Sequence, residues 1–185
     1  MKKLWDYTII KVTLVLTIFT LLTVFFTWPL VPNFNEKIID GRGADPHFVT
    51  WVINENVDNL RSLDFQNYWD TQMFYPYPNS LLFSDHSITL AIQSLPVYIF
   101  TDNLITVQNW TIFLGFFFSA IGGYLLGKLY FKNELAAIAT GFVIAFNPYH
   151  FGLLGHLQIF SYQFIPFLIY FLEKFLKNPS WKSGL

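Results

Sequence analysis

The hydrophobic residues of this chain are gathered in long runs separated by polar segments, and they do not alternate as in half-buried strands. Four apolar runs cover 8–31, 104–127, 135–149 and 158–176. A helix rises about 1.5 Å per residue, so about 20 apolar residues cross the hydrocarbon core of a bilayer. The pattern predicts an all-α integral membrane protein with about four transmembrane helices.

A fifth run over 87–100 is apolar but shorter, because as a helix it measures only about 21 Å, and Pro96 interrupts it. We expect this run to form an interfacial or re-entrant helix. If it crossed the membrane, the lysines at 128, 132, 174, 177 and 182 would face outward, against the positive-inside rule. Lys2, Lys3 and Lys11 likewise place the N-terminus in the cytoplasm.

The composition supports the membrane assignment, since 54% of the residues are hydrophobic, 21% are aromatic and only 12% are charged. So little polar surface does not cover a soluble domain. A secretory signal peptide competes for the first run, but that run is long and lacks a small-residue cleavage pattern. We predict one multi-pass membrane domain over 1–185, in the plasma or inner membrane.

The long polar segment 32–86 is predicted to be an extracytoplasmic loop. Its basic residues are Lys37, Arg42 and Arg61, and its acidic residues are Glu36, Asp40, Asp45, Glu55, Asp58, Asp64, Asp70 and Asp85. This acidic excess argues against nucleic acid as a partner. Within the loop, Gly41 and Gly43 allow a turn, Asp45 is a good N-cap and Pro46 suits the first helical position, which predicts an interfacial helix over 45–60.

Candidate chemistry gathers on the extracytoplasmic side of this topology. All four histidines fall there, at positions 47, 86, 150 and 156, together with Asp45 and Asp85. Ionisable residues near membrane depth tend to mark functional cavities. The spacing between His150 and His156 differs from the i, i+4 geometry of a helical metal pair, so the residues identify no metal site.

Each candidate also has a structural alternative. Asp45 and Asp85 could simply cap the helices that follow them, and His156 and Gln158 could satisfy backbone groups freed around Asn147-Pro148. Both alternatives remain open from the sequence. The chain has no Gly-rich phosphate loop, nucleophile elbow or cysteine, which leaves a cytosolic nucleotide site unsupported and favours a donor that is lipid-linked.

Five motifs occur in order along the chain: Gly43-Ala44-Asp45-Pro46 with Trp51, Phe74-Tyr75-Pro76-Tyr77-Pro78-Asn79, Phe83-Ser84-Asp85-His86, Phe146-Asn147-Pro148-Tyr149 and Gly155-His156-Leu157-Gln158. Together they resemble the N-terminal part of bacterial GT-C-class membrane glycosyltransferases. The resemblance covers nearly the whole chain. The inserted Ala44 departs from the Gly-Asp-Pro typical of the class, and Asp85 stands where relatives often have Glu.

The resemblance implies a polyprenyl-phosphate sugar donor, a glycan, lipid or protein acceptor, and no nucleic acid. It implies that Asp45 acts as general base or helps to hold a divalent cation, with Asp85 as the second catalytic carboxylate. The substrate-binding residues expected beside them are Arg42, His47, Trp51, His86, His150, His156 and Gln158. Of these, His86, His156 and Arg42 are candidates to stabilise the phosphate leaving group.

The chain is short for this class, so we expect it to be an N-terminal portion or a truncated product. A non-catalytic multi-pass membrane assembly subunit is the alternative function. A transporter is less well supported, because the apolar runs contain almost no ionisable residues.

Overall fold

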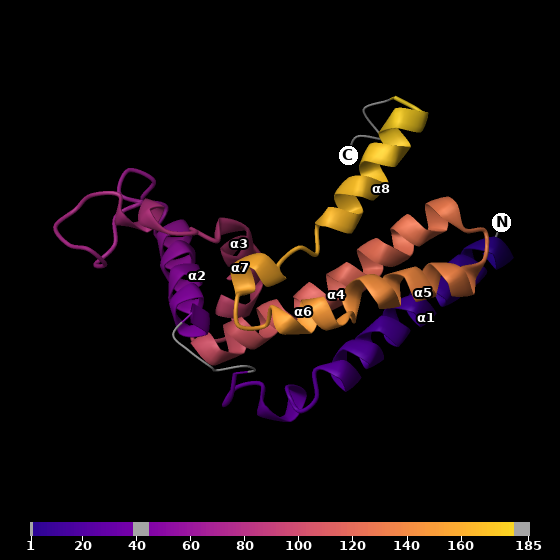
Figure 1. Cartoon of the computed structure of the whole chain (residues 1–185), viewed down its shortest axis with the longest axis horizontal. Coiled ribbons are helices and arrows are strands. Elements are labelled where there is room, and N and C mark those ends of the chain that lie inside the picture. Colours follow the sequence, from indigo (N-terminus) through magenta and orange to yellow (C-terminus); the bar gives the residue numbers. More distant parts are fainter. Residues whose placement is uncertain (1, 39–44, 180–185) are drawn as a thin grey trace. The chain divides into compact units, whose positions relative to one another are not determined.

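The computed structural model describes residues 2–38 and 45–179, with the side chains of α1 described from Thr8, and 70% of the structure is helical (Figure 1). The described residues form no strand. Within the described residues, three stretches are long and apolar enough to cross a membrane: Thr8–Phe26, Leu104–Tyr130 and Leu157–Lys177. The all-α prediction is confirmed, whereas the number of membrane-length stretches is three where the sequence predicted about four.

The helices form two compact units, each assembled from segments that are distant in sequence. The first unit contains residues 2–31, 113–152 and 162–179, and the second contains 32–38, 45–112 and 153–161. The long helix α4 (Leu104–Tyr130) contributes its first residues to the second unit and the rest to the first.

The first unit is built on close helix packing. It contains α1 (Lys2–Phe26), most of α4, α5 (Glu134–Ala145), α6 (Pro148–Gly152) and α8 (Ile165–Lys177). A Cβ added to Gly123 of α4 would lie 2.9 Å from the Cα of Gly141 in α5, and one added to Gly127 would lie 2.9 Å from the Cα of Ala137. Small residues therefore allow the backbones of α4 and α5 to approach closely.

The run 135–149, the third predicted span, does not form one continuous helix in the structure. In the structure α5 has 12 residues, about 18 Å of helix, and the helical path is interrupted before α6 begins at Pro148. Proline disfavours a helical conformation in the residue before it, here Asn147, which explains the break. Residues 146–151 nevertheless stay beside α4, because the ring of Phe116 packs against the rings of Phe146, His150 and Phe151.

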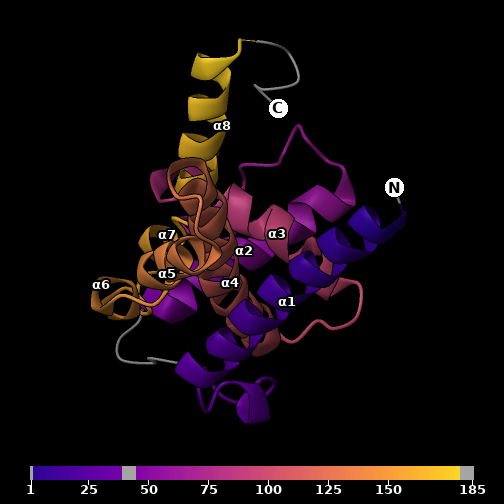
Figure 2. The ribbon, with the colours of Figure 1, turned by 90° about the vertical axis from the view of Figure 1, so that its right-hand side faces the viewer.

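Helix α8 departs from the rest of the first unit. Only Pro166 is buried among its residues, and a Cβ on Gly122 of α4 would meet Phe167 and Pro166. In Figures 1 and 2, α8 leaves α4 and α5 after its first turn. Its later apolar side chains, among them Leu168 and Leu176, are exposed.

The second unit contains α2 (Asp45–Ser62), η2 (Ser80–Phe83), α3 (Ile88–Tyr98), α7 (Leu157–Phe160) and the first turns of α4. These bounds match the helices predicted over 45–60 and 87–100. The buried core of this unit includes Val52 of α2 with Tyr68 and Leu81 of the following loop. Asn56 of α2 holds that loop, because it accepts from the Tyr68 hydroxyl at 2.6 Å and donates to the His86 carbonyl at 2.6 Å.

Candidate functional site

The first turn of α2 carries the carboxylate that the sequence singled out. Asp45 opens the helix, and its Oδ2 lies 3.3 Å from Nδ1 of His156. Both side chains are open to solvent, with exposed fractions of 63% for Asp45 and 48% for His156. Within the described residues the Asp45 carboxylate makes no capping hydrogen bond to the backbone, so its partner there is an imidazole. Two residues predicted for the site therefore meet.

The position of His156 is set by the short helix that it precedes. His156 is the N-cap residue of α7, and the next residue, Leu157, and the last, Phe160, are fully buried. Helix α7 packs against α2, which brings the imidazole to the Asp45 carboxylate. Buried apolar anchors on α7 thus hold an exposed polar residue in place.

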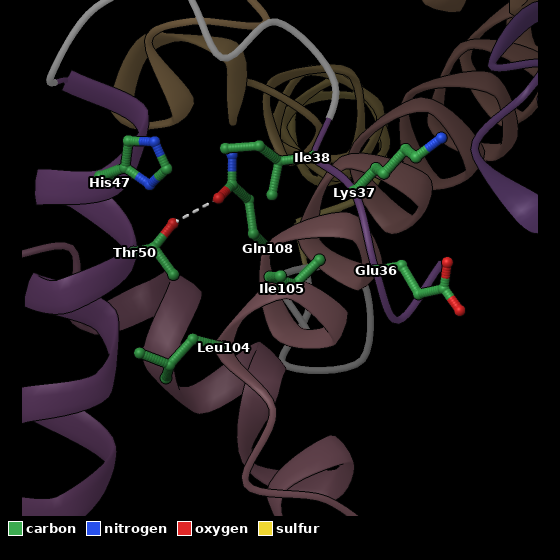
Figure 3. Close-up of a pocket in the computed structure, with 8 residues that line it drawn as sticks. All are labelled: Glu36, Lys37, Ile38, His47, Thr50, Leu104, Ile105 and Gln108. Atoms are coloured by element: carbon green, nitrogen blue, oxygen red, sulfur yellow. Dashed lines mark hydrogen bonds between the residues drawn. The ribbon is translucent and has the colours of Figure 1, made fainter. Parts of the chain in front are cut away.

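A cavity of about 530 Å³ lies on α2 within its first two turns (Figure 3). It is lined by Glu36, Lys37, Ile38, His47, Thr50, Leu104, Ile105 and Gln108. His47 and Thr50 come from α2, the last three residues from α4, and the first three from the segment that follows α1. This volume is within the usual range of small-molecule sites.

The wall between α2 and α4 is polar. The Thr50 hydroxyl lies 2.7 Å from the Pro46 carbonyl and 2.8 Å from Oε1 of Gln108. Gln108 is 1% exposed, and its Nε2 has no hydrogen-bond partner among the described residues. A buried polar atom without a partner costs about 1 to 3 kcal/mol, so this amide is a candidate ligand contact.

Helix α4 also fixes the opposite wall. Nδ2 of Asn109 donates to the carbonyls of Phe34 and Lys37 at 2.9 and 2.7 Å. Nδ2 of Asn103 donates to the Asn35 carbonyl at 2.9 Å, and the Thr106 hydroxyl donates to the Asn35 side chain at 2.9 Å. The segment carrying Glu36, Lys37 and Ile38 is therefore held on α4 by specific hydrogen bonds.

The Asp45–His156 contact and the cavity use different sides of α2. Residues two apart on a helix project in different directions, so Asp45 reaches His156 while His47 lines the cavity. The two features share the same end of the helix but are distinct, with a solvent-exposed carboxylate on one side and a ligand-sized space on the other.

Three predicted residues lie elsewhere in the second unit. Trp51 is half-buried, stacks with Phe48 and packs on the core of Val52, Tyr68 and Leu81. The His86 carbonyl bonds Asn56, which is about 16 Å along α2 from Asp45 at 1.5 Å per residue. Asp85, next to His86, is exposed and does not cap α3, whose N-cap residue is Ser87, so the capping alternative for Asp85 is wrong.

His150 is placed in the first unit and is completely buried. Its Nδ1 lies 2.7 Å from the Ala145 carbonyl, and its ring packs between Phe116 and Tyr162. Asn147 and Tyr162 donate to the Ile144 carbonyl at 2.9 and 3.2 Å. These three side chains satisfy the carbonyls at the break between α5 and α6, which gives His150 a structural role.

The structural alternative for His156 and Gln158 is that they satisfy backbone groups freed around Asn147-Pro148. The described hydrogen bonds at that break come from Asn147, His150 and Tyr162. His156 pairs with Asp45, and Oε1 of Gln158 is buried without a partner among the described residues. Arg42 and the glycine turn before Asp45 lie outside the described residues.

Sequence reasoning missed Thr50, Gln108 and Lys37. A signal for Gln108 was present, since the adjacent amides Gln108 and Asn109 interrupt an otherwise apolar run, and polar groups in such runs tend to be functional. For the implied divalent cation, residues 2–38 and 45–179 contain no group of three His, Asp or Glu side chains placed to hold one.

Comparison of the chain with protein-family models, with curated proteins and with solved structures found no match. A functional assignment for this chain consequently rests on the residues of the site and their geometry.

Proposed function

We propose that this chain belongs to a membrane glycosyltransferase that moves a sugar from a polyprenyl-phosphate donor to an acceptor at the extracytoplasmic face. The observation that carries the proposal is the Asp45–His156 pair, in which a solvent-accessible carboxylate meets an imidazole from a distant segment. The five ordered motifs of the sequence support the same assignment, since two of them supply this pair.

In the proposed reaction Asp45 accepts the proton of the acceptor hydroxyl. The acceptor oxygen forms a bond to the anomeric carbon, and the bond from that carbon to the phosphate oxygen breaks with its electron pair leaving on the phosphate. A single displacement of this kind inverts the anomeric configuration. His156 holds the carboxylate in position through Nδ1. General-base assistance contributes about 10² to 10⁴ in rate.

The proposal places the chain in the plasma or inner membrane with its N-terminus in the cytoplasm. Three apolar stretches of membrane length support this placement, and α5 with α6 would form a broken return path along α4. The chain contains no cysteine, so single cysteines can be introduced for labelling from either side. In intact cells an impermeant maleimide should not label Lys132→Cys, which the proposal places in the cytoplasm. It should label Gln66→Cys, which the proposal places outside.

The function is tested by transfer of a labelled polyprenyl-phosphate sugar in membranes that contain this chain, with any natural extension of its reading frame. Asp45→Asn should lower the transfer rate about 100-fold or more at unchanged protein level. Asp58→Asn is the matched control, because Asp58 is an exposed carboxylate on the same helix that pairs with Asn54. Full transfer by Asp45→Asn would exclude a catalytic role, and absence of transfer from every form would favour a non-catalytic assembly subunit.

A further inference from the structure

The lining of the cavity on α2 is chemically mixed. Ile38, Leu104 and Ile105 are apolar, while the amide of Gln108 and the hydroxyl of Thr50 are polar. In Figure 3 the Gln108 amide lies among His47, Thr50 and Ile38. Sites with an apolar lining and a few directed polar groups suit ligands that are themselves amphipathic.

The polar side of the cavity offers hydrogen bonds that the protein leaves unused. Nε2 of Gln108 is buried and has no partner within the described part of the chain. One end of the Gln108 amide lies 2.8 Å from the Thr50 hydroxyl, and Asn109 holds the facing wall through the carbonyls of Phe34 and Lys37. The other end of the amide has no protein partner among the described residues, and a ligand hydroxyl, which can both donate and accept, would satisfy it.

The charges around the cavity indicate which ligand head it favours. Glu36 and Lys37 both line the space, so their formal charges cancel. The remaining polar groups are an amide, a hydroxyl and the imidazole of His47, which donate to and accept from neutral hydroxyls. A phosphate would meet no net positive charge in this cavity, whereas the hydroxyls of a ring would form hydrogen bonds with the neutral polar groups.

We propose that the cavity formed by α2, the start of α4 and the segment 34–38 binds the hydroxyl-bearing head of a neutral amphiphile through Gln108 and Thr50. The inference rests on the proposed function in one respect, since it identifies this amphiphile as the acceptor, a membrane-borne glycolipid or other polyol lipid. Binding itself does not require transfer. The apolar wall then contacts the first carbons of the lipid chain, and the head lies at the same end of α2 as Asp45.

The test is a titration of the purified full chain in lipid nanodiscs with octyl glucoside below its micelle-forming concentration, followed by saturation-transfer NMR. Octyl phosphate serves as the anionic comparison. We expect octyl glucoside to bind the wild type more tightly than octyl phosphate does. Gln108→Leu should weaken octyl glucoside about 10-fold or more, while Gln93→Leu, the same change in α3 outside the cavity, should leave binding unchanged.

A second variant protects the test against misfolding of Gln108→Leu. Ile105→Trp fills the cavity from its apolar side and should also abolish binding. Equal binding by the wild type, Gln108→Leu and Ile105→Trp, or a preference for octyl phosphate, would overturn the proposal. Asp45→Asn separates ligand binding from sugar transfer. This variant should bind octyl glucoside normally, and a change in its transfer activity tests only the proposed function.

Discussion

Nδ1 of His156 lies 3.3 Å from the carboxylate of Asp45, and this contact joins the start of α2 to the start of α7. Exposed ion pairs contribute roughly 0 to 1 kcal/mol to stability, so folding alone gives little reason to keep the pair. In the proposed function this contact keeps the Asp45 carboxylate accessible and oriented.

Replacing Asp45 or His156 should therefore lower the transfer activity while leaving the free energy of unfolding nearly unchanged. Asp45→Asn and His156→Gln should each change the free energy of unfolding by less than about 1 kcal/mol. Denaturant unfolding in detergent, followed by the fluorescence of the chain's tryptophans, measures this change. A loss of several kcal/mol in either variant would show instead that the pair is a structural element of the second unit.

Packing of α4 against α5 should tolerate no side chain at Gly141. A Cβ there would lie 2.5 Å from the Ala120 carbonyl oxygen and 2.7 Å from Cζ of Phe19. Gly141→Val should lower the free energy of unfolding by about 2 kcal/mol or more, because helix backbones must separate. Gly152→Ala is the control, since a Cβ at Gly152 meets nothing within 4 Å, and it should change stability by less than about 0.5 kcal/mol.

The ends of α1, α4 and α5 are joined by Glu134, and this should make stability depend on pH. Burial opposes ionisation of Glu134, but hydrogen bonds from Lys11, Lys128 and Tyr124 outweigh it and lower its pKa from 4.5 to about 2. The carboxylate therefore contributes stability above pH 4.5, and that contribution is lost as the pH falls from 4.5 towards 2.

Because the Glu134 side chain is 32% exposed, solvent screening limits this loss to about 1 to 2 kcal/mol. Unfolding of the wild type measured at intervals between pH 6 and pH 2.5 should show the decline. Glu134→Gln should remove that part of the pH dependence. An identical pH profile in the two proteins would contradict the assignment.

The break between α5 and α6 should depend on Asn147. Its side chain donates to the Ile144 carbonyl and accepts from the His150 amide, both at 2.9 Å. Asn147→Ala should cost about 1 to 2 kcal/mol and speed hydrogen exchange around the break, because buried polar groups lose partners. Tyr149→Ala changes an exposed residue at the same break and should have little effect on either quantity.

Local features of the fold could be predicted because their causes are local. The Asp45-Pro46 helix start of α2 and the long apolar run of α4 are visible in the sequence, and helices occur where they predict them. The length of α5 is harder to predict from the sequence. Asn147-Pro148 signals a break, but the side chains that make the break stable include Tyr162, which comes from a later segment.

The candidate site likewise combines a feature that the local sequence predicts with contacts that depend on the packing of distant segments. Asp45 was identifiable from its position at a helix start, whereas its contact with His156 depends on how α7 packs against α2. His150 was grouped with the site because it shares a predicted membrane side, and only the three-dimensional structure shows that it is buried at the break. Gln108 carries no charge, so the pattern of ionisable residues in the sequence does not point to it.

The most direct test of the account is a double-mutant comparison of sugar transfer by the wild type, Asp45→Asn, His156→Gln and the combined variant. If His156 acts by positioning the Asp45 carboxylate, His156→Gln should lower the rate about 10-fold or more, and the combined variant should be no slower than Asp45→Asn. Two results would contradict the claim that this pair is the reaction centre. One is a rate loss in the combined variant equal to the product of the two single losses, and the other is full transfer by Asp45→Asn.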